Sequence, residues 1–185
     1  MNTPMDVVKS YPVRKSKKQK QAFRADVTQW LQGLGYSVRE EEGSFHSRNL
    51  VIGDPQRAKY LVTAHYDTCA RLPFPNLITP CNFWTFLLYQ FFICLLLMLP
   101  ALAVGGLVGY LLHSFDIGYF LFMVLLWAAI VLMLIGPANP SNVNDNTSGV
   151  VTLLEIAKSI PELHRGNVCF VLFDLEEAGL IGSAS

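Results

Sequence analysis

Two long stretches without charge, residues 83–112 and 117–135, constrain the fold more than any other feature of the sequence. The first has 30 residues and the second 19, and between Arg71 and Asp145 the one Asp, Glu, Lys or Arg is Asp116. A helix needs about 20 apolar residues to cross the core of a bilayer. Two buried helices of a soluble core are the alternative, but only HSFD joins the two stretches. We therefore predict a transmembrane hairpin inserted at residues 83–135, with the lipid bilayer as its partner.

The residues that flank the hairpin predict its orientation. HSFD has no Lys or Arg, whereas Arg71 and a basic N-terminal run lie on the other side. The positive-inside rule then places both flanking segments in the cytoplasm. Seven of the 14 basic residues fall in the first 24 positions, which suits anionic lipid, nucleic acid or, more simply, a solvated helix start. Because 14 acidic residues balance the 14 basic ones, we expect no nucleic-acid partner. The hairpin itself predicts an integral membrane protein.

The segments on either side of the hairpin alternate between helix and strand patterns. Helical spacing of apolar residues occurs at 16–34, after Ser16 as a cap, and at 150–160. Strand patterns occur at residues 36–42, 45–52 (with Gly43 at the turn between these two), 60–64 and 167–173. The last two are nearly continuous apolar runs, typical of strands buried on both faces. The alternation predicts an α/β fold with helices on both sides of a sheet.

Polar clusters stand beside the predicted buried elements at three places. They are His65 and Asp67 in AHYDT, Asp145 in NDNTSG, and Glu176 and Glu177 in DLEEAG. Each alone has a simpler interpretation, respectively a surface His–Asp pair, an Asx turn that caps a helix, and a solvated helix start. In open α/β sheets, however, sites form beyond the carboxyl ends of the strands. One imidazole and several carboxylates together predict a site for zinc or a related divalent ion.

The residue types allow a division of labour in such a site. His65 can bind a metal through one ring nitrogen while Asp67 accepts a hydrogen bond from the other. Capping of the next helix by Asn146, Thr147 or Ser148 would leave the Asp145 carboxylate free. Two metals about 3.5–4 Å apart can share a bridging carboxylate and activate a water, with a Glu as general base. This is the chemistry of a hydrolase.

Four stretches of the chain resemble the co-catalytic di-zinc exopeptidases of metallopeptidase family twenty-eight. They are NLVIGD (49–54), YLVTAHYDT (60–68), NDNTSGVVTLLEIA (144–157) and FVLFDLEEAGLIGS (170–183). The resemblance implies a three-layer mixed sheet with helices on both faces, two Zn²⁺ per complete site and peptides as substrates. It further implies an aminopeptidase-like activity that removes N-terminal residues.

The resemblance also assigns a role to each candidate residue. His65 is similar to the ligand of one zinc, and Asp67 to the acid that orients it. Asp145 is similar to the carboxylate that bridges both metals, with a cis peptide bond after it. Glu176 matches the general base, and Glu177 matches a ligand of the second zinc.

The family takes one more acid and one more His from sequence that would follow Ser185. We therefore expect residues 1–82 and 136–185 to form the N-terminal part of a peptidase domain, without the C-terminal part of the fold. This chain alone would then be inactive. Two alternatives stay open, namely a non-catalytic membrane protein with a degenerate peptidase domain and a glutaminyl cyclase-like acyltransferase with a single zinc on the same fold.

Overall fold

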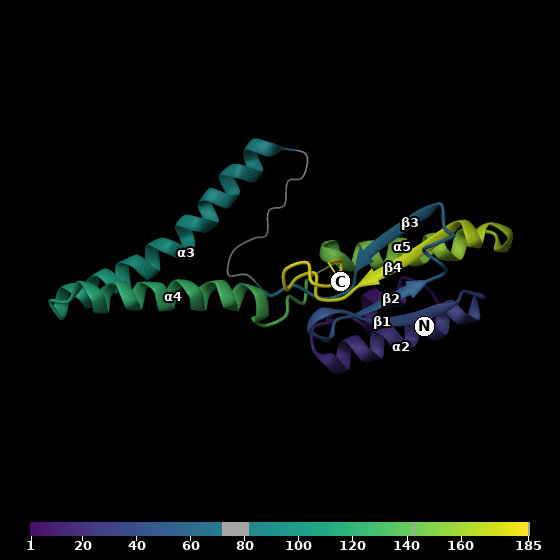
Figure 1. The fold of residues 1–185 in the computed structure, drawn as a ribbon, viewed down its shortest axis with the longest axis horizontal. Coiled ribbons are helices and arrows are strands. Elements are labelled where there is room, and N and C mark those ends of the chain that lie inside the picture. The colour runs from purple at the N-terminus through teal and green to yellow at the C-terminus, as the bar shows by residue number, and fades with distance from the viewer. Residues whose placement is uncertain (72–81, 142, 185) are drawn as a thin grey trace. The chain divides into compact units, whose positions relative to one another are not determined.

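The computed structural model describes residues 1–71, 82–141 and 143–184, and the chain divides into two compact units (Figure 1). The sheet unit comprises residues 1–71 and 138–185, and the hairpin unit comprises residues 72–137. The predicted boundary at residue 82 adjoins residues 72–81, which lie outside the described residues. The predicted division therefore stays a prediction.

A four-stranded mixed sheet forms the centre of the sheet unit. Its strands are β1 (Val38–Glu42), β2 (Arg48–Ile52), β3 (Tyr60–His65) and β4 (Val168–Phe173), in the order β1-β2-β4-β3. β2 is antiparallel to both of its neighbours, whereas β3 runs parallel to β4. In this register His65 lies opposite Phe173, so both parallel strands end at the same edge. The segments AHYDT and DLEEAG therefore begin side by side.

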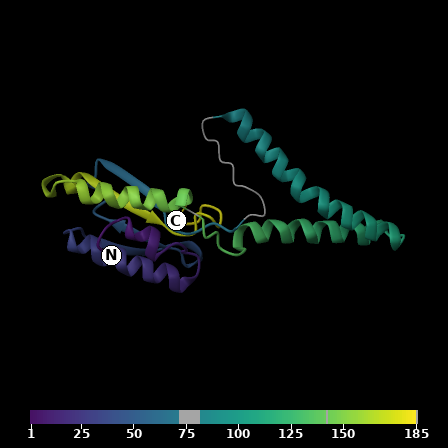
Figure 2. The same ribbon diagram turned by 180° about the vertical axis from the view of Figure 1, so that it is seen from behind.

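Helices α2 (Lys17–Gly33) and α5 (Ser148–Ser159) both pack on one face of the sheet. Their buried residues share a single core with one side of β2 and β4: Phe23, Val27, Leu31, Leu50, Ile52, Val150, Leu153, Leu154, Ala157, Phe170 and Leu172. The opposite side has a separate small cluster of Val51, Cys169 and Val171. Among the described residues the fold is thus a mixed α/β arrangement of two layers, and the expected helices on both faces are not found (Figures 1 and 2).

The α2 helix begins as predicted, and two basic residues near its start are buried. The Ser16 side chain accepts a hydrogen bond from the Gln19 backbone N–H, and the Gln19 side chain returns one to the Ser16 backbone, which forms a capping box. However, Arg14 is 0% exposed and Lys20 only 8%. The interpretation of the whole basic run as a solvated helix start is therefore wrong for these two residues, because both have polar partners inside the fold.

Two predicted strands differ from the structure. The stretch expected as a strand from residue 45 begins at Arg48, because Ser44–His46 forms a short 3-10 turn. In this turn the Ser47 N–H donates to the Ser44 carbonyl, and the Gly43 N–H donates to the Ser47 carbonyl. The apolar β3 is an edge strand of the described sheet rather than a strand buried on both faces, since β4 pairs with one side of it. Its residues Tyr60 and Leu61 are 66% and 60% exposed.

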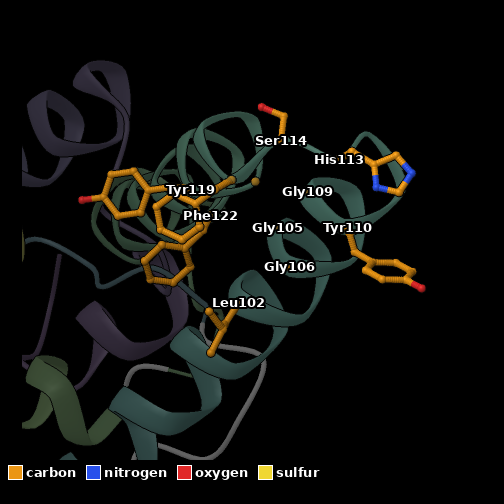
Figure 3. A pocket seen from close by; sticks show the side chains of 11 residues that line it. Leu102, Gly105, Gly106, Gly109, Tyr110, His113, Ser114, Tyr119 and Phe122 are labelled. Atoms are coloured by element: carbon orange, nitrogen blue, oxygen red, sulfur yellow. The ribbon is translucent and has the colours of Figure 1, made fainter.

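The hairpin unit contains α3 (Phe83–Leu111) and α4 (Phe115–Ile135), close to the predicted spans. Both helices are long and apolar enough to cross a membrane by length and composition, with a mean hydropathy of 2.6 in the most apolar window of each. A Cβ on Gly105 would lie 2.6 Å from the Gly118 carbonyl oxygen, so the two backbones approach closely near the hairpin tip. Beside this crossing lies a hollow of about 380 Å³ that Leu102, Tyr119 and Phe122 help to line (Figure 3).

Candidate metal centre

Three candidate ligands from separate parts of the sequence meet at one point. The Nε2 atom of His65 lies 3.4 Å from Oδ1 of Asp145 and 3.8 Å from Oε1 of Glu177. One potential ligand atom from each residue falls within 4.8 Å of the other two, and all three side chains are half-buried. These are the three metal ligands that the sequence predicts.

The fold explains this convergence. His65 is the last residue of β3, and Glu177 follows β4 at the same edge of the sheet. Asp145 lies in the irregular turn Val143–Thr147 that leads into α5, and the peptide bond from Asp145 to Asn146 is cis, as the resemblance implies. The Asn146 side chain accepts a hydrogen bond from the Gly149 N–H at 3.0 Å and so caps α5. The Asp145 carboxylate is thereby left to face His65.

Asp67 fixes the positions of the other site residues. It is only 4% exposed, and its Oδ1 lies 3.3 Å from Nδ1 of His65, on the other side of the ring from Asp145. The same carboxylate accepts backbone hydrogen bonds from Glu176 at 3.2 Å and from Glu177 at 3.0 Å. Asp67 therefore joins the loop after β3 to the loop after β4 and orients the imidazole between two carboxylates.

The electrostatics of the site favour a cation. Burial alone lowers the pKa of His65, but hydrogen bonds to Asp145 and Asp67, with the charges of Asp67 and Glu177, outweigh it and raise the pKa to about 10. Burial, and then repulsion by Asp145, raise the pKa of Glu177 to about 7, although His65 acts in the opposite direction. Positive charge at this point is thus stabilised and negative charge is in excess.

The geometry fits a zinc ion. Tetrahedral ligands about 2.0–2.2 Å from zinc lie about 3.3–3.6 Å from one another. The His65 separations of 3.4 and 3.8 Å from Asp145 and Glu177 are close to this range. Nδ1 of His65 also has a carboxylate partner, one of the acceptors that the second ring nitrogen of a metal-bound histidine usually has. The three residues suit one ion directly, while the assignment of ligands to two zincs stays a prediction.

Glu176, the predicted general base, lies next to the cluster without being part of it. Its backbone N–H is held by Asp67, and its Oε1 accepts a hydrogen bond of 2.6 Å from the Ser183 N–H. The side chain is half-buried. This carboxylate is thus fixed within the loop that supplies Glu177.

The structure adds residues that the sequence reasoning missed. Asp174 is 1% exposed and accepts a hydrogen bond of 2.7 Å from the buried Lys20 Nζ. Asn49 accepts from the Asp174 N–H at 3.0 Å and donates to the Gly182 carbonyl at 2.9 Å. A Cβ on Gly182 would lie 1.9 Å from the Asp174 carbonyl oxygen, so glycine is required there. The stretches NLVIGD and FVLFDLEEAGLIGS contain Asn49 and its two partners, but no local pattern distinguishes Lys20 from its basic neighbours.

Arg14 is another missed residue. Its guanidinium donates to the Tyr66 carbonyl and to Oγ1 of Thr147, and these partners adjoin two of the three metal motifs. Burial lowers the pKa of Arg14 to about 10, partly offset by the charge of Asp67. No periodicity in the sequence distinguishes Arg14 from its basic neighbours.

Comparison with known proteins agrees with the site. Residues 133–185 match the model of a family described as peptidase family M28. The matched stretch includes Asp145, Glu176 and Glu177 but neither His65 nor Asp67. No curated protein and no solved structure matches the chain. The match shows that residues 133–185 are similar to the M28 peptidases, which suggests a peptidase-like function.

Proposed function

We propose that this protein is a zinc-dependent exopeptidase of the aminopeptidase type, anchored in a membrane by α3 and α4. The convergence of His65, Asp145 and Glu177 carries the proposal. Two of them lie within the M28 match, and the third arrives from β3, outside it. Each ring nitrogen of His65 faces a carboxylate, Asp67 on one side and Asp145 on the other. A chance grouping of half-buried acids does not explain this arrangement.

The residues divide the work of hydrolysis. His65, Asp145 and Glu177 would hold the metal, and Asp67 would keep Nε2 of His65 directed toward it. Zinc bound there would polarise the scissile carbonyl and activate a water. Glu176 takes the proton of that water and returns it to the leaving amine, as a general base and then a general acid. The hydrogen bond from Ser183 supports this role because it restrains the carboxylate.

The three candidate ligands by themselves account for one zinc ion, and the proposed count of two rests on the resemblance to co-catalytic peptidases. Three protein ligands and a water form the usual coordination of one catalytic zinc. A second ion requires Asp145 to bridge and further protein ligands beyond these three. We propose two ions, as in co-catalytic peptidases, where His65 would serve one ion, Glu177 the other and Asp145 both.

The hairpin unit supports membrane attachment. Long apolar side chains cover both helices, for example Trp84 and Phe120 with 72% and 69% exposed. Water is a poor solvent for such a surface, whereas a bilayer is a good one. We propose that both helices span the membrane and that the sheet unit faces the cytoplasm, where peptides are the substrates.

Metal content tests the proposal most simply. The 185-residue chain purified in detergent should bind zinc, and His65→Ala should lose it. Glu176→Gln should retain the metal, while the protein with this change should release no N-terminal residues from peptides. A wild-type chain without zinc affinity would contradict the metal site, and turnover by the Glu176→Gln protein would contradict the role of Glu176.

One observation favours a second candidate. The three ligands fit a single ion without further residues, which is the count expected for a glutaminyl cyclase-like acyltransferase. Incubation of the gene product with a peptide that begins with glutamine separates the two reactions. Release of free glutamine indicates the peptidase, whereas loss of ammonia with a cyclic N-terminus indicates the cyclase.

A further inference from the structure

Arg14 is a fully buried cation outside every helix and strand. It lies between α1 (Asp6–Ser10) and α2, and its side chain is 0% exposed. The guanidinium carbon lies 5.4 Å from the centre of the Phe23 ring, in the core. Burial of a charge is costly unless the surroundings supply hydrogen bonds and opposite charge. The partners of Arg14 therefore indicate what it does.

The first group of partners is the loop after β3. The Arg14 N–H donates to Oγ1 of Thr68 at 2.8 Å, and its carbonyl accepts from the Thr68 N–H at 3.1 Å. Its Nε donates to the Tyr66 carbonyl, and a terminal guanidinium nitrogen donates to the Tyr11 carbonyl in its own segment. The contacts with Tyr66 and Thr68 lie on either side of Asp67, the residue that orients His65. Arg14 thus holds the backbone that carries the first metal motif.

The second partner lies in the turn before α5. A terminal guanidinium nitrogen of Arg14 donates to Oγ1 of Thr147 at 2.9 Å, and Thr147 is 1% exposed. Thr147 comes two residues after Asp145. One guanidinium therefore bonds both to the segment of His65 and to the segment of Asp145.

The positive charge of Arg14 also interacts with Asp67, the carboxylate beside His65. Asp67 is itself buried. Asp67 in turn accepts the backbone N–H groups of Glu176 and Glu177. Arg14 therefore places a buried positive charge near the carboxylate that holds both loops, which offsets part of the cost of burying that carboxylate.

We propose that Arg14 is a positioning residue of the metal centre, which fixes the separation of His65 and Asp145 by bonding to both of their segments. This inference rests on the proposed metal site. Arg14 itself does not contact the ion or the substrate. Its effect passes through Tyr66, Thr68 and Thr147.

Arg165 offers a matched control. Like Arg14, it lies over an aromatic ring, 5.0 Å from the centre of Tyr36, and donates to two backbone carbonyls, those of Leu34 and Ile160. None of these partners belongs to a metal motif. Arg165→Met therefore removes a similar packed guanidinium without touching the site.

The main test is zinc affinity, measured by competition with a chelator on the full chain in detergent. Arg14→Met should weaken binding about 10- to 100-fold, the usual effect of losing a residue that supports metal ligands. Arg14→Lys should recover part of the affinity, because it restores the charge but not the forked geometry. Arg165→Met should bind zinc like the wild type, even where it unfolds at a lower temperature.

Thr147→Val tests the same link if Arg14→Met fails to fold. It removes one hydroxyl acceptor and keeps the buried cation, and it should also weaken zinc binding. Wild-type affinity in Arg14→Met, or in Thr147→Val where Arg14→Met does not fold, would overturn the proposal. An equal loss of affinity in Arg165→Met would overturn it as well, because the effect would then be general destabilisation.

Hydrogen exchange of the metal-free protein separates this inference from the proposed function. Arg14→Met should speed exchange at the amides of Thr68 and of residues 147–149, whereas Arg165→Met should not. If the wild type binds no zinc, the proposed metal function fails, and the exchange result still decides whether Arg14 positions the two segments. Unchanged exchange at both places would overturn the positioning role.

Discussion

Large apolar side chains are buried in the sheet unit but exposed in the hairpin unit. In the sheet unit Phe23 is 0% exposed and stacks on Tyr66, with ring centres 5.2 Å apart. In the hairpin unit Phe120 is 69% exposed, and many other apolar residues of α3 and α4 are exposed as well. The sheet unit removes its apolar residues from water through its own packing. The hairpin unit leaves its apolar residues exposed, as the proposed bilayer would require.

The same substitution in both units gives the largest expected contrast. Phe23→Ala should lower the free energy of unfolding of the sheet unit by about 3–5 kcal/mol, since it empties a packed core position. Phe120→Ala should change the stability of the hairpin in micelles by less than about 0.5 kcal/mol, as at other sites without packed partners. Equilibrium unfolding of each variant in the same detergent measures both. Similar losses at the two positions would break the comparison.

A glycine pair in the sheet unit tests how closely its loops are packed. Gly182→Ala brings a Cβ against the Asp174 carbonyl oxygen, so the loop must shift and its hydrogen bond to Asn49 is lost. We expect a loss of about 2–3 kcal/mol. Gly166→Ala, where nothing lies within 4 Å of the new Cβ, should stay within about 0.5 kcal/mol of the wild type. Chemical denaturation measures the difference, and equal midpoints would contradict the close approach.

A second glycine pair tests the hairpin with a smaller expected effect. Gly105→Ala would place a Cβ 2.6 Å from the Gly118 carbonyl oxygen, whereas Gly106→Ala meets nothing within 4 Å. We expect the first to destabilise the helix pair by about 1–2 kcal/mol through overpacking. The second should stabilise α3 by up to about 1 kcal/mol, since alanine is the better helix former. Unfolding in mixed micelles checks the opposite signs, and a shared sign would place the crossing elsewhere.

The sequence predicted elements whose causes are local. The capping box of Ser16 and Gln19 marks the start of α2, and the uncharged runs mark both helices of the hairpin unit. The proximity of His65 and Glu177 was also predicted, because strand ends in a parallel pair meet at one edge, whereas their role as metal ligands stays a prediction. His65 and Glu177 follow this rule directly.

Features that depend on distant partners were not predicted. The acceptors of Arg14 lie 52 and 133 residues further along the chain, so no local pattern distinguishes it from an exposed arginine. The placement of α2 and α5 on one face depends on how the chain returns to the sheet. The spacing of apolar residues within each helix does not indicate this. The exposure of Leu61 likewise depends on which strands stand beside β3 and not on the apolar run itself.

Zinc binding by the purified 185-residue chain tests the central claim most directly. We predict tight binding of zinc in the wild type and a loss of at least about 100-fold in affinity in each of His65→Ala, Asp145→Ala and Glu177→Ala, because each removes one of three ligands. His164→Ala, which changes an exposed histidine outside the cluster, should bind as the wild type does. Zinc affinity that survives loss of all three residues, or no affinity in the wild type, would contradict the account.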